Sequence, residues 1–84
     1  MSPKEIIELQ RERSFPGLRI HISDGASYEV RHPELMLVTP GRVYIALPPL
    51  KDGVPTGGAV YCDPVHITRI EPLNGERKGA SRKR

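Results

Sequence analysis

The spacing of apolar residues changes along the chain and divides it into a helix followed by strands. Near the N-terminus, Ile6, Ile7 and Leu9 fall on one side of a helical wheel, opposite charged side chains. Residues 2–5, Ser-Pro-Lys-Glu, are typical of a helix start, because Ser can cap, Pro suits the first position and Glu completes a capping box. A Pro-Gly pair at 16–17 ends the pattern. We predict one amphipathic helix over about residues 3–13, too short to be stable undocked.

From residue 18 the apolar residues recur at every second position, which is typical of strands with one wet face. Residues 18–23 and 26–31 alternate in this way, and Asp24-Gly25 between them is a tight-turn signal. His32-Pro33 interrupts the second strand, because Pro cannot donate to a ladder, and predicts a bend within residues 26–38. The continuous apolar run at 35–38 indicates a strand buried on both sides or lying at a subunit contact.

The C-terminal half continues in shorter segments. Residues 39–42, Thr-Pro-Gly-Arg, predict a turn with Pro and Gly in type II positions, and an alternating strand follows at 42–47. Residues 48–58 contain three Pro and three Gly and predict a mobile loop. Short strands at 59–62 and 67–71 flank Asp63-Pro64, where Asp can cap and Pro can open one helical turn.

These elements predict a mainly β fold, a small five- or six-stranded barrel or half-barrel with one short N-terminal helix. A core of this size rarely supplies more than about 3–5 kcal/mol of stability. Closing the sheet, or pairing its edges with neighbouring subunits, would remove exposed edges and add buried area. We therefore expect a homo-oligomer, with a number of subunits that the sequence does not fix.

The order of these elements over residues 3–73 resembles the Sm-like fold, a small SH3-like barrel. That fold has an N-terminal helix, a hairpin with a long bent second strand, a third strand, a variable loop and two short strands separated by one helical turn. Residues 60–68, Val-Tyr-Cys-Asp-Pro-Val-His-Ile-Thr, are similar to the Val-Tyr-Lys-His-Ala-Ile-Ser segment of the bacterial Sm-like RNA chaperone, but have two extra residues and lack its RNA-binding Lys-His pair. Residues 18–33 also resemble a family of short uncharacterised bacterial proteins. The resemblance implies a fold, not a function.

Composition limits the class of protein. A length of 84 residues excludes a multidomain enzyme, and 8 Gly with 9 Pro favour short strands and turns over a helical bundle. The only cysteine, Cys62, excludes an intramolecular disulfide and a thiolate-based zinc site and fits a reducing cytoplasm. No apolar stretch approaches the roughly 20 residues of a membrane span, and the N-terminus has no run resembling a secretion signal. We expect a cytoplasmic protein with no membrane contact and no cofactor.

The basic residues are concentrated at the C-terminus. Of 13 basic and 10 acidic residues in the chain, five basic and one acidic lie in residues 74–84, which leaves 8 basic and 9 acidic for residues 1–73. The C-terminal segment also has no large apolar residue to bury. We predict one nearly neutral domain at 1–73 and a basic disordered tail at 74–84.

Catalytic and metal chemistry find little support in the sequence. The three histidines and Cys62 lack metal-ligand spacing. Cys62 and His66, four residues apart across a turn, are an alternative as a nucleophile pair, but Cys62 alternates with Val60 and is better explained as a core residue. We expect no enzyme, because no set of acid, base and nucleophile has a recognisable spacing.

Arginine and tyrosine share the polar positions of the predicted strands. Surfaces that bind single-stranded nucleic acid use this mixture, because bases stack on rings while guanidinium groups meet phosphates. The candidate binding residues are Arg19, Arg31, Arg42, Tyr44 and Tyr61 in the strands and Arg77, Lys78, Arg82, Lys83 and Arg84 in the tail. The ordinary alternative is a solvated face on which Glu29, Glu34 and Glu71 neutralise the cations.

The leading prediction is therefore a non-enzymatic module that binds RNA or single-stranded nucleic acid as a homo-oligomer. The alternative is a protein–protein interaction or regulatory module that recruits its partner through an exposed strand edge or through the apolar segment 35–38.

Overall fold

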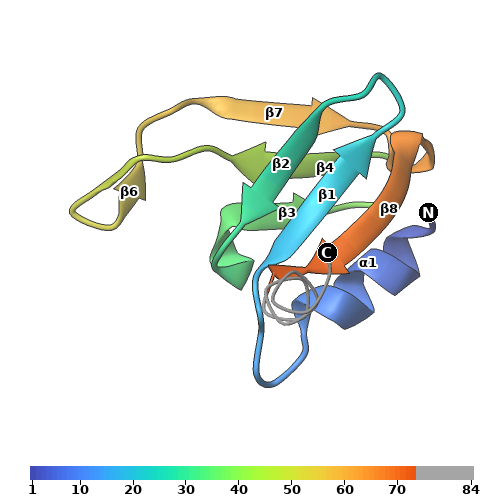
Figure 1. The fold of residues 1–84 in the computed structure, drawn as a ribbon, viewed down its shortest axis with the longest axis horizontal. Helices are drawn as coiled ribbons and strands as arrows, with labels where there is room; N and C mark the ends of the chain where they lie inside the picture. The colour runs from blue at the N-terminus through green and yellow to red at the C-terminus, as the bar shows by residue number, and fades with distance from the viewer. Residues whose placement is uncertain (74–84) are drawn as a thin grey trace, which may run out of the picture.

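The protein is described here from a computed structural model that places residues 1–73. In chain order the elements are α1 (Pro3–Gln10), β1 (Leu18–Ile22), β2 (Ser27–Val30), η1 (Pro33–Leu35), β3 (Met36–Val38), β4 (Val43–Ala46), β5 (Leu50–Lys51), β6 (Val54–Pro55), β7 (Ala59–Cys62), η2 (Pro64–His66) and β8 (Ile67–Pro72). The strands form the sheets β2-β1-β8, β3-β4-β7 and β5-β6, all antiparallel (Figure 1). The prediction of a mainly β fold with one short helix is confirmed. Residues 1–73 contain eight strands instead of the expected five or six, because the segment predicted as a loop adds two short ones. No closed barrel is found among these residues, so the barrel is unconfirmed.

The helix begins as its sequence predicts. The backbone N–H of Glu5 donates to Ser2 Oγ at 3.2 Å, and the N–H of Ser2 donates back to the Glu5 carboxylate at 3.0 Å. The helix ends at Gln10, three residues earlier than expected, because the polar residues that follow are exposed and have no face to bury. Ile6 is fully buried, and Gln10 Nε2 donates to the carbonyls of Pro33 and Met36, which fixes α1 against the start of β3.

The hydrophobic core lies between the two three-stranded sheets, which cross one another in Figure 1. Alternation puts Leu18 and Ile20 of β1, and Val43 and Ile45 of β4, on the inner faces, where all four are essentially buried. The core members are Ile6, Leu18, Ile20, Val30, Leu35, Met36, Val43, Ile45 and Ile67. The outer faces of both sheets carry mainly polar and aromatic side chains, with Leu37 as an exposed aliphatic exception.

The predicted bent strand at residues 26–38 is divided into two strands. Pro33 occupies the first position of η1, and this turn separates β2 in one sheet from β3 in the other. Of the two expectations for residues 35–38, burial on both sides is wrong: Leu35 and Met36 are buried, but 61% of Leu37 is exposed. The other, a subunit contact, stays a prediction. The apolar run hides an ordinary alternation, in which Leu37 points outward.

Two turn predictions need correction. Gly41 does not have the positive φ of a type II turn; the hairpin is closed instead by Thr39, whose N–H donates to the Arg42 carbonyl at 2.8 Å. Residues 48–58, predicted as a loop, form the β5–β6 ribbon, which projects from the two larger sheets and is called the arm below (Figure 1). Asp52 and Gly53 have positive φ at its tip, as a tight hairpin requires.

Candidate functional site

The structure divides the candidate binding residues between two outer faces. Arg19 and Arg31 lie on or beside the sheet β2-β1-β8, whereas Arg42, Tyr44 and Tyr61 lie on the sheet β3-β4-β7. Alternation in the sequence shows that a side chain points outward, but not which of two sheets carries it. The remaining candidates lie outside the described residues: Arg77, Lys78, Arg82, Lys83 and Arg84.

The outer face of β2-β1-β8, which we call the charged face, carries ion pairs centred on two glutamates. Glu29 accepts from Arg19 Nη2 at 2.6 Å through one carboxylate oxygen and from Arg31 Nη2 at 2.6 Å through the other. The hydrogen bond from Arg19 is the main cause that lowers the pKa of Glu29. Two of the five candidate residues in the strands are thus held by a carboxylate.

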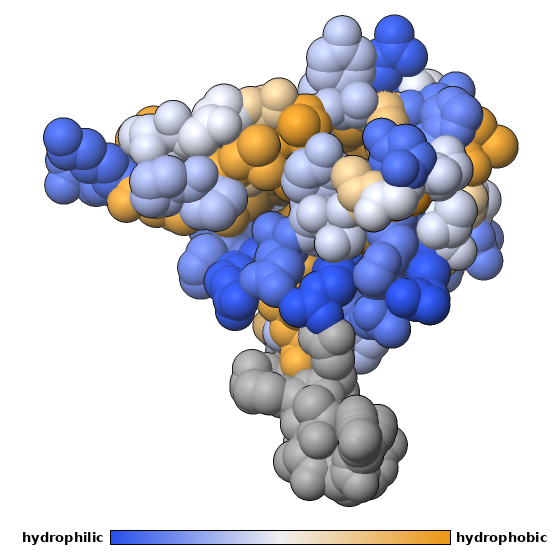
Figure 2. All heavy atoms as spheres, turned by 45° about the horizontal axis from the view of Figure 1, so that its top comes forward, coloured by the Kyte–Doolittle hydropathy of each residue, from blue (hydrophilic) through white to orange (hydrophobic). Residues whose placement is uncertain are grey.

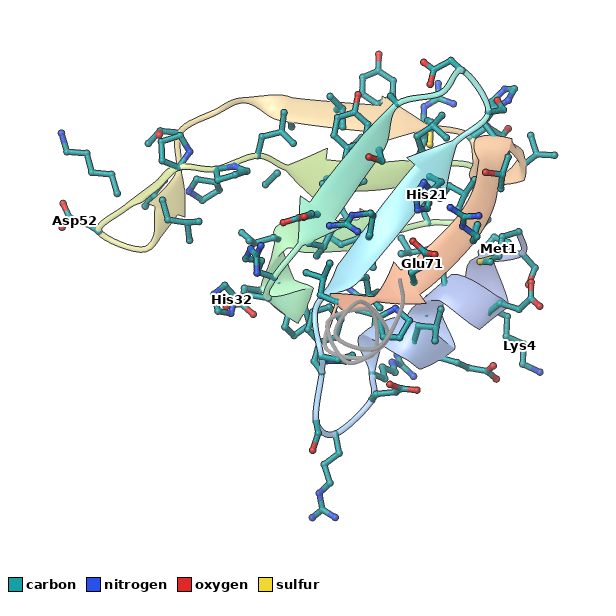
Figure 3. The ribbon with its side chains drawn as sticks, viewed as in Figure 1. Met1, Lys4, His21, His32, Asp52 and Glu71 are labelled. Atoms are coloured by element: carbon teal, nitrogen blue, oxygen red, sulfur yellow. The ribbon has the colours of Figure 1, made fainter. Side chains whose placement is uncertain are left out.

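Glu71 organises the other half of the charged face. One of its oxygens lies 2.8 Å from His21 Nε2 and the other 3.5 Å from Arg69 Nε, and Figure 3 shows His21 and Glu71 next to each other. The hydrogen bond with His21 is the largest cause that lowers the pKa of Glu71. This compensated surface, seen as the hydrophilic area of Figure 2, fits the ordinary alternative of a solvated face.

The outer face of β3-β4-β7, which we call the aromatic face, consists of Leu37, Arg42, Tyr44 and Tyr61. Strand register places Leu37 beside Tyr44 and Tyr44 beside Tyr61, in one row across the three strands. The two tyrosine rings are tilted by 36° with centroids 5.6 Å apart, and both side chains are exposed. The row presents two aromatic planes and one aliphatic side chain to the solvent.

Arg42 differs from the arginines of the charged face. Its Cζ lies 5.4 Å from the centroid of the Tyr61 ring, a cation–π contact, and its Nη1 donates to the Gly41 carbonyl at 3.4 Å. Within residues 1–73 it forms no ion pair, so its positive charge is not neutralised by a carboxylate. The aromatic face can therefore stack a planar group and offer a guanidinium to an anion.

Cys62 and His66, the nucleophile pair considered from the sequence, line one cavity, but no hydrogen bond joins them in the structure of residues 1–73. Burial is the first cause that raises the pKa of the Cys62 thiol, followed by the nearby carboxylates of Asp63 and Asp24, and this opposes thiolate formation. His66 Nδ1 lies 3.3 Å from Ser23 Oγ instead. In the part of the chain that the structure describes, no three His, Cys, Asp or Glu side chains gather in a way that could hold a metal ion.

Sequence reasoning missed one residue of the aromatic face, Leu37. Alternation along a strand puts the side chains of residues 36 and 38 on one face and that of residue 37 on the other. All three residues are apolar, so the sequence does not mark which face is exposed.

Comparison with known proteins adds no functional assignment. No protein-family model matches the chain, and neither a curated protein nor a solved structure matches it. Among residues 1–73 there is no helix long and apolar enough to cross a membrane.

Proposed function

We propose that this protein is a non-enzymatic binding module that binds RNA or another single-stranded nucleic acid on the aromatic face. The observation that carries the proposal is the exposed Tyr44–Tyr61 pair with Arg42 beside it, a cation that no carboxylate of residues 1–73 neutralises.

The geometry suits stacked bases. Base–aromatic stacking contributes roughly 1–3 kcal/mol per base and tolerates any sequence, because every base has a π-face. Tyr44 and Tyr61 offer two such platforms on adjacent strands, and Leu37 extends the row with an apolar contact. The Arg42 guanidinium lies over one face of the Tyr61 ring, which leaves the other face for a base and puts the cation close enough to meet a phosphate beside that base. The proposed ligand is therefore recognised by its flat bases and its negatively charged phosphates, with little preference for sequence.

The charged face is not part of the proposed site. A phosphate there would compete with Glu29 for Arg19 and Arg31 and would lie near a second carboxylate, Glu71. Both glutamates have a lowered pKa and stay ionised at neutral pH, so they disfavour a polyanion.

We propose further that the module acts as a homo-oligomer. One aromatic face with two stacking residues offers a small contact area. Several subunits bound to the same nucleic-acid chain would gain avidity without any new contact in each subunit. The arm leaves Leu50 and Val54 exposed, and these apolar side chains are candidates for contact with a second copy.

The proposal is tested by titrating the full chain against fluorescein-labelled decauridylate and following fluorescence anisotropy. Arg42→Gln is expected to weaken binding by about tenfold, in the range of a lost charge-assisted hydrogen bond. The matched control Arg69→Gln removes the same charge from the charged face and should leave the affinity unchanged. Equal losses in the two variants, or no binding by the wild-type chain, would reject the proposal.

A further inference from the structure

Among residues 1–73, one edge of the sheet β2-β1-β8 has backbone groups that no other strand pairs. The N–H of Ile22 donates to the Ala26 carbonyl at 2.9 Å, and hydrogen-bonded pairs alternate along an antiparallel ladder. The residues of β2 that bond to β1 are therefore Tyr28 and Val30. The hydrogen bonds on the other side of β1 agree with this assignment. There Gly17 accepts from the Leu73 N–H at 3.0 Å, so the odd-numbered residues of β1 bond to β8 and the even-numbered ones bond to β2.

The N–H and C=O groups of Ser27 and Glu29 consequently point away from β1, along the free edge of β2. Within residues 1–73 no backbone group pairs with them. Two other edges are protected: Gln10 donates to the Met36 carbonyl on β3, and Pro72 deprives β8 of one N–H. The edge of β2 carries neither device, and such an edge is a template for a further strand.

An apolar cavity lies beside the start of this edge. It has a volume of about 100 Å³ and is walled mainly by apolar side chains of the β1–β2 hairpin and of β4 and β7: Ile22, Tyr28, Val43, Ile45, Val60 and Cys62. Asp24 and Tyr61 complete its lining. An apolar cavity of roughly 150 Å³ can hold benzene, so this smaller one has room for one aliphatic side chain. Figure 2 shows apolar atoms exposed on the surface beside the arm.

A second cavity lies at the other end of β2. It has a volume of about 120 Å³ and is lined by Glu29, Arg31, His32, Leu35, Pro48 and Leu50, where the base of the arm approaches η1. Figure 3 shows His32 at this end. The free backbone edge thus runs between two hollows that side chains of an added strand could enter.

The two ends of the edge differ in charge. At the first cavity Asp24 forms part of the wall, and Asp63 follows Cys62 directly in the chain. At the second cavity lie Arg31 and His32, with Arg31 held by Glu29 but 64% exposed at its side chain. A ligand that lies along β2 is therefore favoured when its basic end meets Asp24 and its acidic end meets Arg31.

We propose that the edge of β2 binds an extended peptide of a partner protein as an added antiparallel strand. The peptide pairs with Ser27 and Glu29 and places an aliphatic side chain in the cavity beside Val60. Its acidic N-terminal end lies toward Arg31 and its basic C-terminal end toward Asp24. Only a peptide backbone matches the alternating donors and acceptors of a strand edge, and antiparallel pairing is the more stable arrangement. The site shares Tyr61 with the aromatic face, because Tyr61 also lines the first cavity, but its backbone pairing lies on β2 and the proposal does not rest on nucleic-acid binding.

The test uses the full chain and the fluorescein-labelled peptide Glu-Val-Thr-Leu-Thr-Lys, followed by fluorescence anisotropy. The account predicts saturable binding, with the charge-reversed peptide Lys-Val-Thr-Leu-Thr-Glu weaker by about tenfold. Asp24→Asn should weaken binding of the first peptide but not of a version with Met in place of Lys. Asn keeps the turn, because its side-chain oxygen can still accept from the Ala26 N–H as Asp24 does now. The control Asp52→Asn, at the arm tip, should change nothing.

Ser27→Pro provides the backbone test. It removes one N–H from the free edge while the hydrogen bonds between β2 and β1 remain. The affinity for the peptide should fall by about tenfold, the order of one lost hydrogen bond. Absence of binding by the wild-type chain, equal binding of the two charge orders, or insensitivity to Asp24→Asn would overturn the proposal. A dimer of this chain that uses the edge of β2 and excludes the peptide would also overturn it.

Discussion

Tyr44 and Tyr61 lie directly opposite each other on β4 and β7, with ring centroids 5.6 Å apart and with 38% and 63% of the two residues exposed. A cross-strand pair of this kind stabilises a sheet by only about 0.2–1 kcal/mol, so stability alone does not require two aromatic residues here. What the pair does provide is a surface of two ring planes next to Arg42.

Replacing Tyr61 by Ala should weaken binding of decauridylate between about fivefold and about 150-fold, the effect of losing roughly 1–3 kcal/mol of base stacking. The measurement is fluorescence anisotropy at fixed ionic strength. Tyr61→Phe is the matched control, because it keeps the ring and removes only the hydroxyl, and it should bind like the wild type. An unchanged affinity of the Ala variant would show that Tyr61 does not stack on the ligand.

The contribution of the C-terminal basic residues to nucleic-acid binding can be separated from that of the aromatic face by measuring the affinity at several salt concentrations. Changing Arg77, Lys78, Arg82, Lys83 and Arg84 together to Gln removes at most five phosphate contacts. Each contact with a single strand contributes about 0.7 to the slope of log affinity against log salt concentration, so the slope should fall by at most about 3.5. Binding by this variant should persist, and Tyr61→Ala should weaken it further. Complete loss of binding would mean that the tail alone holds the nucleic acid.

The main elements of the fold could be predicted because their signals are local. The capping box at Ser2 fixes the start of α1, and strict alternation at Leu18–Ile22 fixes which side chains of β1 enter the core. The arm was missed because its strands have two residues each, too few for a period to show, and its Pro and Gly residues are also typical of an irregular loop. Its Asp52-Gly53 pair was the one hairpin signal in the segment.

The candidate site could be predicted only in part, for a physical reason. Outward orientation is a property of one strand, but the grouping of side chains on a face depends on which strands pair. The pairing of β4 with β7 brings Tyr44 and Tyr61 together although they are 17 positions apart in the sequence. The pairing of β1 with β2 places Arg19 next to Glu29 and away from the tyrosines. Neither pairing can be read from local spacing.

The ion pairs of the charged face should make stability depend on acid pH. The pKa values of Glu29 and Glu71 lie below their ordinary value of 4.5 in the folded protein, so the folded state binds these protons less tightly than the unfolded chain. Their contribution is complete above pH 4.5 and is lost as the pH falls through the lowered values. In Glu71→Gln, urea midpoints at pH 7 and pH 3 should therefore differ less than in the wild type.

Glu34→Gln is the control for the acid experiment, because it removes the same charge from a residue with no ion pair among residues 1–73. Its pH dependence should follow that of the wild type. If Glu34→Gln and Glu71→Gln shift the midpoints equally, the effect comes from net charge and not from the ion pair with His21 and Arg69.

Gly57 is required by a close approach at the base of the arm. A Cβ atom there would overlap the backbone carbonyls of Pro48 and Leu47, and Gly57 itself donates to the Leu47 carbonyl at 3.0 Å. Gly57→Ala should lower the free energy of unfolding by about 1–3 kcal/mol, the usual cost of overpacking. Gly41→Ala is the matched control, since Gly41 has open space and no positive φ. Urea denaturation measures both; equal stability of the two variants would contradict the geometry at the arm.

We propose that the nucleic acid lies on the aromatic face, and an amide chemical-shift titration of the ¹⁵N-labelled full chain with decauridylate shows which residues the ligand contacts. We expect the amides of Leu37, Arg42, Tyr44 and Tyr61 to shift together along one saturating curve, while those of Arg19, Glu29 and Glu71 on the charged face stay in place. Shifts confined to residues 74–84, or centred on the charged face, would contradict it.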